Sequence, residues 1–194
     1  MKSNLALIVT GTIFWMCASC NYGIPERSSV DMMFHVDTAR LAQQAFYSNT
    51  AELGVYPPAG WDSADSRQFF SDTIANNLFA GIKAMYYAPE QENMLLVQDY
   101  PSSDTALVNR IFKDPNTWYN SDSTWSSVMS DSFIYKSLAM QQIVLQNPQL
   151  VVFKIFIRNQ PGILELNYVV KTGASPETMK SVESSIGSVY SLTN

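Results

Sequence analysis

The strongest hydrophobic pattern lies in the C-terminal half of the chain. Residues 137–146, 150–158 and 163–171 are rich in β-branched and aliphatic side chains, and short segments with Pro, Asn and Gly separate them. Within 163–171 the even-numbered positions are all apolar, whereas the odd-numbered positions mix apolar, polar and charged side chains. This alternation predicts an antiparallel meander of three strands whose last strand has one apolar face.

The preceding part of the chain changes between helical and alternating patterns. Two apolar-rich segments, 82–87 and 94–99, are joined by a polar loop with Glu90 and Glu92, which predicts a β-hairpin. Residues 55–61 contain two prolines and a glycine and cannot be helical. The region 116–131, rich in Ser, Asp and Trp, gives no clear pattern.

Apolar residues at helical spacing predict four helices. They cover residues 37–47, 66–80, 104–113 and 175–190. Asp37, Asp104 and Ser175 are placed to cap the first turns of three of them. The order of elements predicts an α+β fold in which an antiparallel β-sheet is flanked by α-helices.

The N-terminus is organised as a bacterial targeting signal. Lys2 precedes an apolar segment over residues 5–18, and this segment is shorter than the roughly 20 residues that span a bilayer. The segment ends in Cys17-Ala18-Ser19-Cys20, which resembles the lipobox of bacterial lipoproteins. The resemblance implies cleavage before Cys20 and acylation, including palmitate, of that residue, although Cys17 stands where the lipobox usually has an aliphatic residue.

Two other interpretations of this segment stay open. Cys17 and Cys20 form a C-x-x-C pair, but they end an apolar leader, whereas redox pairs need a folded helix start that lowers a thiol pKa. The second alternative is a secreted protein without a lipid. On the favoured interpretation, residues 1–19 are a signal peptide, 20–33 a lipidated cysteine and tether, and 34–194 a single globular domain.

That interpretation also predicts where the protein is found. It predicts attachment to the cell envelope through Cys20, and Asn21 rather than Asp after the cysteine favours the outer membrane, with the domain facing the periplasm. The formal net charge is −5 over 194 residues, and no Lys/Arg-rich segment is present, which argues against nucleic acid as a partner. Both cysteines lie in the first twenty residues, so the predicted domain has no disulfide or cysteine metal site.

The order hairpin, helix, three-strand meander and closing helix resembles the PsbP-like fold, an antiparallel sheet sandwiched by helices. The resemblance covers about residues 51–192 and includes the Pro58-Ala59-Gly60-Trp61 turn. Among bacterial members it is nearest in kind to the DcrB-like envelope lipoproteins. It implies a binding or assembly module and supplies no catalytic residues.

The sequence contains few groups that could carry out catalysis. His35 is the only histidine, no Gly-x-Ser-x-Gly turn is present, and neither a metal site nor a cofactor is predicted. The aromatic residues Trp118, Tyr119 and Trp125 form the candidate surface for a partner or ligand. We therefore expect a non-enzymatic envelope lipoprotein that binds a protein partner, with two alternatives: a periplasmic module for a small ligand or glycan, and an unrecognised hydrolase.

Overall fold

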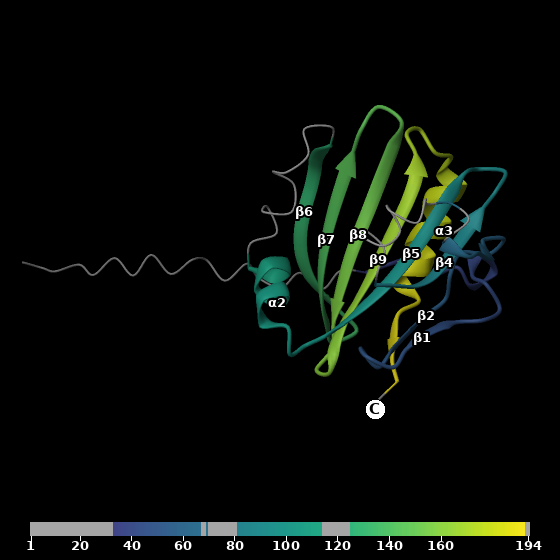
Figure 1. The fold of residues 1–194 in the computed structure, drawn as a ribbon. Coiled ribbons are helices and arrows are strands. Elements are labelled where there is room, and N and C mark those ends of the chain that lie inside the picture. The colour runs from purple at the N-terminus through teal and green to yellow at the C-terminus, as the bar shows by residue number, and fades with distance from the viewer. Residues whose placement is uncertain (1–32, 67–68, 70–80, 114–124, 193–194) are drawn as a thin grey trace, which may run out of the picture.

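The computed structural model describes residues 33–66, 69, 81–113 and 125–192. The main structure is an antiparallel sheet of seven strands in the order β3-β4-β5-β9-β8-β7-β6 (Figure 1). The strands are β3 (Asp62–Ser63), β4 (Ile82–Ala88), β5 (Asn93–Pro101), β6 (Ser126–Tyr135), β7 (Leu138–Gln146), β8 (Leu150–Arg158) and β9 (Gly162–Lys171). The predicted hairpin and meander are confirmed as β4–β5 and β7–β8–β9.

A smaller sheet and three helical segments complete the described part. The small sheet has the order β1-β2-β10 and is formed by β1 (Phe46–Ser48), β2 (Leu53–Val55) and β10 (Tyr190–Ser191). The helical segments are the 3-10 turn η1 (Thr38–Arg40), α2 (Thr105–Phe112) and α3 (Pro176–Gly187). No helix among the described residues is both long and apolar enough to cross a membrane.

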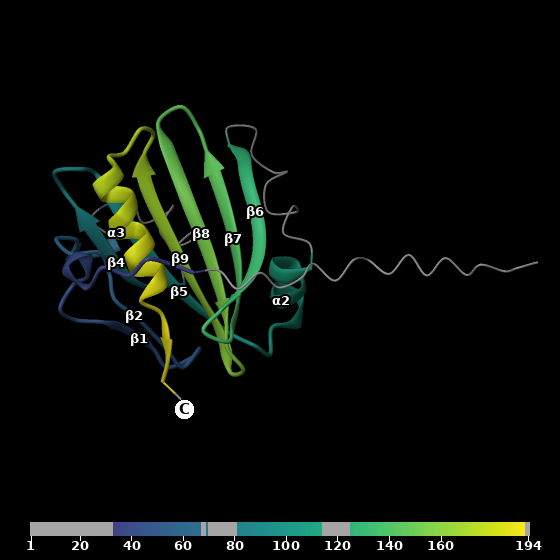
Figure 2. The same ribbon diagram turned by 180° about the vertical axis from the view of Figure 1, so that it is seen from behind.

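Helix α3 covers one face of the large sheet, where the main core lies (Figure 2). The predicted apolar face of β9 points here: Leu164, Leu166 and Tyr168 are all fully buried. The hydroxyl of Tyr168 lies 2.8 Å from Oγ of Ser185 on α3, and Ser185 itself donates to the carbonyl of Tyr56 at 2.6 Å. Tyr168 is therefore the donor of the first bond, and a buried hydroxyl is satisfied.

Helix α2 packs on the opposite face of the sheet but covers only one end of it. Ile111 of α2 is fully buried against Ile143, Phe156 and Ile163 of the central strands. Asp104 caps the helix by accepting a hydrogen bond from the backbone N–H of Leu107, as the sequence predicts. The sheet with helices on both faces confirms the predicted α+β architecture.

The helix predicted over 37–47 is wrong. Asp37 caps only the 3-10 turn η1, and Leu41 is already extended. The chain instead pairs with the Pro-rich turn: Ala42 N–H donates to the carbonyl of Pro57 at 2.8 Å, and Ala59 N–H donates to the carbonyl of Arg40 at 2.8 Å. These tertiary hydrogen bonds take the place of those of a helix, because contacts with a distant segment outweigh a weak local preference for helix.

Two further predictions need correction at their boundaries. The last helix begins at Pro176 behind the Ser175 cap as predicted, but it ends at Gly187, and Tyr190 pairs with β2 in the small sheet. The unclear region 116–131 includes the start of β6, a long edge strand. The helix predicted over 66–80 lies almost wholly outside the described residues.

Candidate functional site

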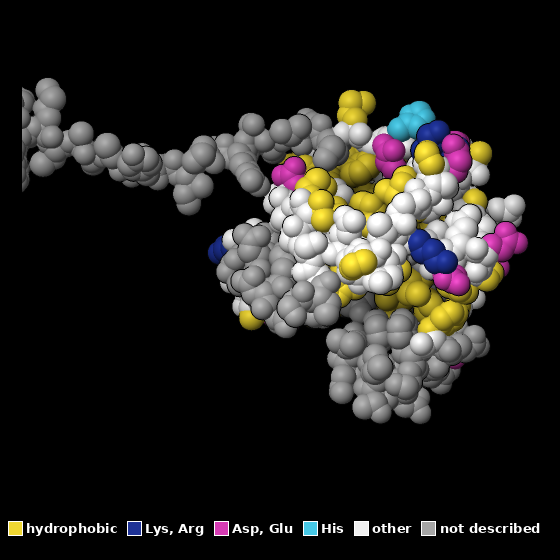
Figure 3. Space-filling view, turned by 90° about the horizontal axis from the view of Figure 1, so that it is seen from above, with side chains coloured by type: hydrophobic (Ala, Val, Ile, Leu, Met, Phe, Trp, Pro, Cys, Tyr) yellow, Lys and Arg dark blue, Asp and Glu magenta, His cyan; other side chains and the backbone are white. Residues whose placement is uncertain are grey.

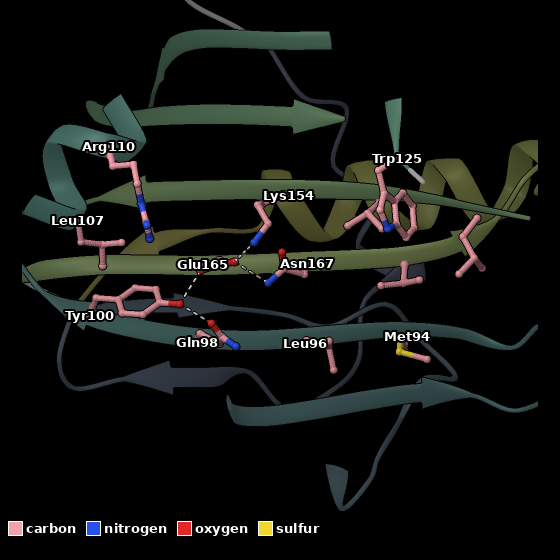
Figure 4. Close-up of a pocket in the computed structure, with 13 residues that line it drawn as sticks. Met94, Leu96, Gln98, Tyr100, Leu107, Arg110, Trp125, Lys154, Glu165 and Asn167 are labelled. Atoms are coloured by element: carbon pink, nitrogen blue, oxygen red, sulfur yellow. Dashed lines mark hydrogen bonds and ion pairs between the residues drawn. The ribbon is translucent and has the colours of Figure 1, made fainter. Parts of the chain in front are cut away.

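A cleft opens on the sheet face opposite α3, beside α2. It has a volume of about 620 Å³, within the range of about 300–1,000 Å³ of small-molecule sites. Strands β5, β8 and β9 form its floor, and α2 and Trp125 lie at its ends (Figure 4). Its lining residues are Met94, Leu96, Gln98, Tyr100, Leu107, Arg110, Trp125, Leu150, Val152, Lys154, Glu165, Asn167 and Val169.

The strand register explains why these side chains share one face. In β9 the odd-numbered residues point away from the α3 core, and Glu165 is paired with Gln98 of β5 while Asn167 is paired with Lys154 of β8. Because directly opposite residues in a sheet project to the same side, the polar groups of three strands converge on the cleft floor. The mixed face that the sequence predicts for this strand is therefore the floor of the site.

Glu165 is the centre of a polar cluster in this floor. Its carboxylate forms an ion pair with Lys154 and accepts a hydrogen bond from Asn167 Nδ2 at 2.9 Å. Tyr100 donates to its other oxygen at 2.7 Å and also contacts the side-chain amide of Gln98. Only 2% of the Glu165 side chain is exposed, so these partners replace the water that a carboxylate would otherwise bind.

The electrostatics of the cluster extend to α2. Burial of the phenol, followed by the nearby Glu165 carboxylate, raises the pKa of Tyr100, and the positive charge of Arg110 opposes that shift. Tyr100 therefore stays a neutral hydrogen-bond donor at physiological pH. Arg110 lies on the exposed side of α2 with its guanidinium directed toward the cleft floor (Figure 4).

The opposite half of the cleft is apolar. Met94 of β5, Val169 of β9 and Val152 of β8 are neighbours across the sheet and form its floor. The half-buried Trp125 and Leu150 complete it. The cleft thus has a polar end beside α2 and an apolar end beside Trp125 (Figure 4).

The structure brings only part of the predicted site into view. Trp125 lines the cleft, whereas Trp118, Tyr119 and Cys20 lie outside the described residues. His35 is exposed and lies against α3, on the other side of the sheet, where its backbone N–H donates to Glu183 at 3.0 Å. Within the described ranges, no group of three or more His, Cys, Asp or Glu side chains could hold a metal ion.

Sequence reasoning missed most of the polar cluster. Glu165 and Asn167 are visible as polar positions inside an otherwise apolar strand, and Lys154 is a charge in the middle of the neighbouring strand. Charged residues in central strands are almost never fully buried without a partner. Charged residues inside apolar strands therefore indicated a buried polar cluster, but its members could not be matched to one another without the strand register.

Comparisons with known proteins identify the fold. The sequence matches no protein-family profile and no curated protein. The structure is similar to the solution structure of cyanobacterial PsbP (CyanoP) from Synechocystis sp. PCC 6803, with a TM-score of 0.51 and 13% identity over 84% of this chain and 98% of that one. A crystal structure from Bacteroides thetaiotaomicron VPI-5482 has a TM-score of 0.40 and 12% identity, over 76% of this chain and 48% of that one. The chain therefore has a PsbP-like fold, as the sequence resemblance predicted.

Proposed function

We propose that this protein is a non-catalytic binding module of the cell envelope and that the cleft beside α2 is its ligand site. The observation that carries the proposal is the cleft itself, a concave apolar surface of about 620 Å³ with a few convergent polar groups. We therefore favour the binding of a small ligand, which was the alternative from the sequence, over the binding of a protein partner. The cleft gives a ligand a specific place to bind.

The state of Glu165 favours binding over catalysis. A general base must lie within reach of a substrate proton, but the Glu165 carboxylate is buried and is held by three donors, Tyr100, Asn167 and Lys154. The only histidine is across the sheet. A polar floor held in this way suits the orientation of a bound molecule better than proton transfer.

The test is saturable binding of N-phenylnaphthylamine, an uncharged probe whose fluorescence rises in apolar surroundings. The chain from residue 20 onward with Cys20→Ser is suitable, because every residue of the described core and cleft lies after residue 33. We expect one probe molecule per chain. The variant Val152→Trp, which fills the cleft from its floor, should abolish binding.

A matched control comes from the edge of the sheet. Val128 on β6 is 58% exposed and does not line the cleft, so Val128→Trp adds the same ring elsewhere and should leave probe binding unchanged. Circular dichroism and thermal unfolding check that both variants fold. Absence of saturable binding, or equal binding by both variants, would overturn the proposed function.

We further propose that acyl chains on Cys20 hold the protein at the outer membrane, facing the periplasm. Support comes from the sequence alone, since Cys20 lies outside the described residues. Several buried acyl chains, each contributing about 0.8 kcal/mol per methylene, would make the attachment stable. Mass spectrometry of the native protein should find an acylated Cys20 at the N-terminus, and Cys20→Ser should leave the membrane fraction. An unmodified Cys20 would contradict this.

One observation also favours an envelope protein partner as a second candidate. Strand β6 is an edge of the large sheet, and Val128 and Met129 on it are 58% and 41% exposed. Exposed edge strands can pair with a strand from another chain. Cross-linking in intact envelopes from Met129→Cys should capture a protein, and Met129→Pro should prevent its association; capture that the proline does not affect would count against a β6 interface.

A further inference from the structure

The lining of the cleft carries a charge opposite to that of the whole protein. Arg110 and Lys154 contribute two positive charges and Glu165 one negative charge, so the lining has a formal net charge of +1, whereas the chain has −5. Most charged side chains in view in Figure 3 lie toward one side of the molecule, and the centre of that surface is hydrophobic or uncharged. The formal charge of the cleft lining thus differs in sign from that of the whole chain.

The position of these charges matters as much as their number. Arg110 lies at the end of the cleft near α2, Lys154 and Glu165 lie toward its middle, and the end beside Trp125 is formed by apolar side chains (Figure 4). A ligand that fits this site must itself have a charged or polar end and an apolar end. The apolar lining offers too few hydrogen-bond partners for a glycan, whose many hydroxyls would lose their water.

The pairing within the cluster decides the sign of the ligand's charge. A cation would have to bind Glu165, but Lys154 and Asn167 hold one of its oxygens and Tyr100 holds the other. Binding a cation would break contacts of a carboxylate that is 2% exposed. An anion instead approaches Arg110, which is exposed and presents a planar set of donors suited to a carboxylate. Lys154 can keep its ion pair with Glu165 while another of its three N–H donors faces the anion.

We propose that the cleft binds an amphiphile with a single alkyl chain and an anionic head group, the chemistry of a fatty acid. The alkyl chain lies over Val152 and Val169 beside Trp125, and the carboxylate lies between Arg110 and Lys154. This inference rests on the proposed function, because it names the ligand class of the same cleft. Charge complementarity and the apolar floor together define the occupant.

The experiment is displacement of N-phenylnaphthylamine from the same chain by three amphiphiles that share a dodecyl-length chain. Laurate is anionic, dodecyl maltoside is neutral and dodecyltrimethylammonium is cationic, and each is used below the concentration at which it forms micelles. We expect laurate to displace the probe at a concentration about tenfold lower than the cationic compound, with the neutral compound between them.

Two variants of α2 show whether the preference comes from the cleft. Arg110→Gln removes the proposed partner and should weaken laurate roughly three- to tenfold while leaving dodecyl maltoside unchanged. Lys113→Gln removes the same charge from an exposed residue one position after the same helix, outside the cleft lining. It should change neither affinity by as much as twofold, since solvent screens its charge.

The outcomes separate this inference from the proposed function. If the probe binds but laurate is no better than dodecyltrimethylammonium, the cleft is a ligand site and the anionic head group is wrong. Equal losses from Arg110→Gln and Lys113→Gln would also overturn the inference, because they would indicate a general charge effect. If the probe itself does not bind, the proposed function fails first.

Discussion

The ion pair between Lys154 and Glu165 gives the sharpest test of how the cleft floor is held together. Lys154→Met leaves the Glu165 carboxylate, which is 2% exposed, without its cation. We expect a loss of about 3 kcal/mol in the free energy of unfolding, because an uncompensated buried charge is costly even with Tyr100 and Asn167 still donating to it. Glu165→Gln should cost only about 1 kcal/mol, since the Lys154 side chain, 18% exposed, can extend its amine to solvent.

Combining the two substitutions removes both charges. The double variant should cost about 2 kcal/mol, less than the sum of about 4, because it leaves no buried ion unpaired. Unfolding in urea, followed by fluorescence and circular dichroism, measures the three free energies. The exposed pair Lys171 and Glu92, 54% and 63% exposed with 2.7 Å between the charged atoms, is the control, with an expected coupling below ~1 kcal/mol. Additive losses at Lys154 and Glu165 would refute the reasoning.

Three further predictions concern close packing and pH. Gly162→Ala should cost about 3 kcal/mol or more in thermal unfolding, because a Cβ there would lie 2.5 Å from the backbone oxygen of Thr50, which cannot move aside easily. Gly54→Ala places a Cβ 2.4 Å from Cζ of Tyr190, so it should destabilise by about 1–3 kcal/mol, and far less in a Tyr190→Ala background. Burial raises the pKa of Tyr168, so the unfolded state releases its proton first: the stabilising contribution is complete below about pH 10 and falls above it. Exposed tyrosines such as Tyr47 ionise without unfolding, but the part of the tyrosinate absorbance that comes from Tyr168 should appear together with unfolding. Ionisation of all tyrosines before the protein unfolds would contradict this.

The sheet could be predicted because its strands follow simple side-chain periodicity. In β9 the alternation of Leu164, Leu166 and Tyr168 with polar neighbours reflects one face against α3 and one face toward the cleft. The turns between β7, β8 and β9 are marked by Pro, Asn and Gly. Local chemistry was sufficient there, since neighbouring segments pair with each other.

The errors fall where distant segments compete with local preference. Apolar spacing after Asp37 favours a helix, but pairing of Arg40 and Ala42 with the 57–59 turn overrides it. Tyr190 leaves the predicted end of the last helix for the same reason, because it pairs with Gly54, far away in sequence. No window of a dozen residues contains that information.

The candidate site was harder to predict than the fold. Its aromatic member Trp125 was identified from composition, but the polar cluster is assembled from β5, β8 and β9 by their register. A shift of one residue in β9 would turn Glu165 into the core. Which charged residues line the cleft can therefore be inferred only when the pairing of the strands is known.

The most direct test of the central claim is a map of backbone amide chemical shifts in the isotope-labelled chain during titration with laurate. The account predicts saturable changes on β5, β8 and β9 around Leu96, Lys154 and Asn167 and on α2 around Arg110, with little change on α3. Changes confined to α3 and the segment around His35, or none at concentrations below micelle formation, would contradict the assignment of this cleft as the binding site.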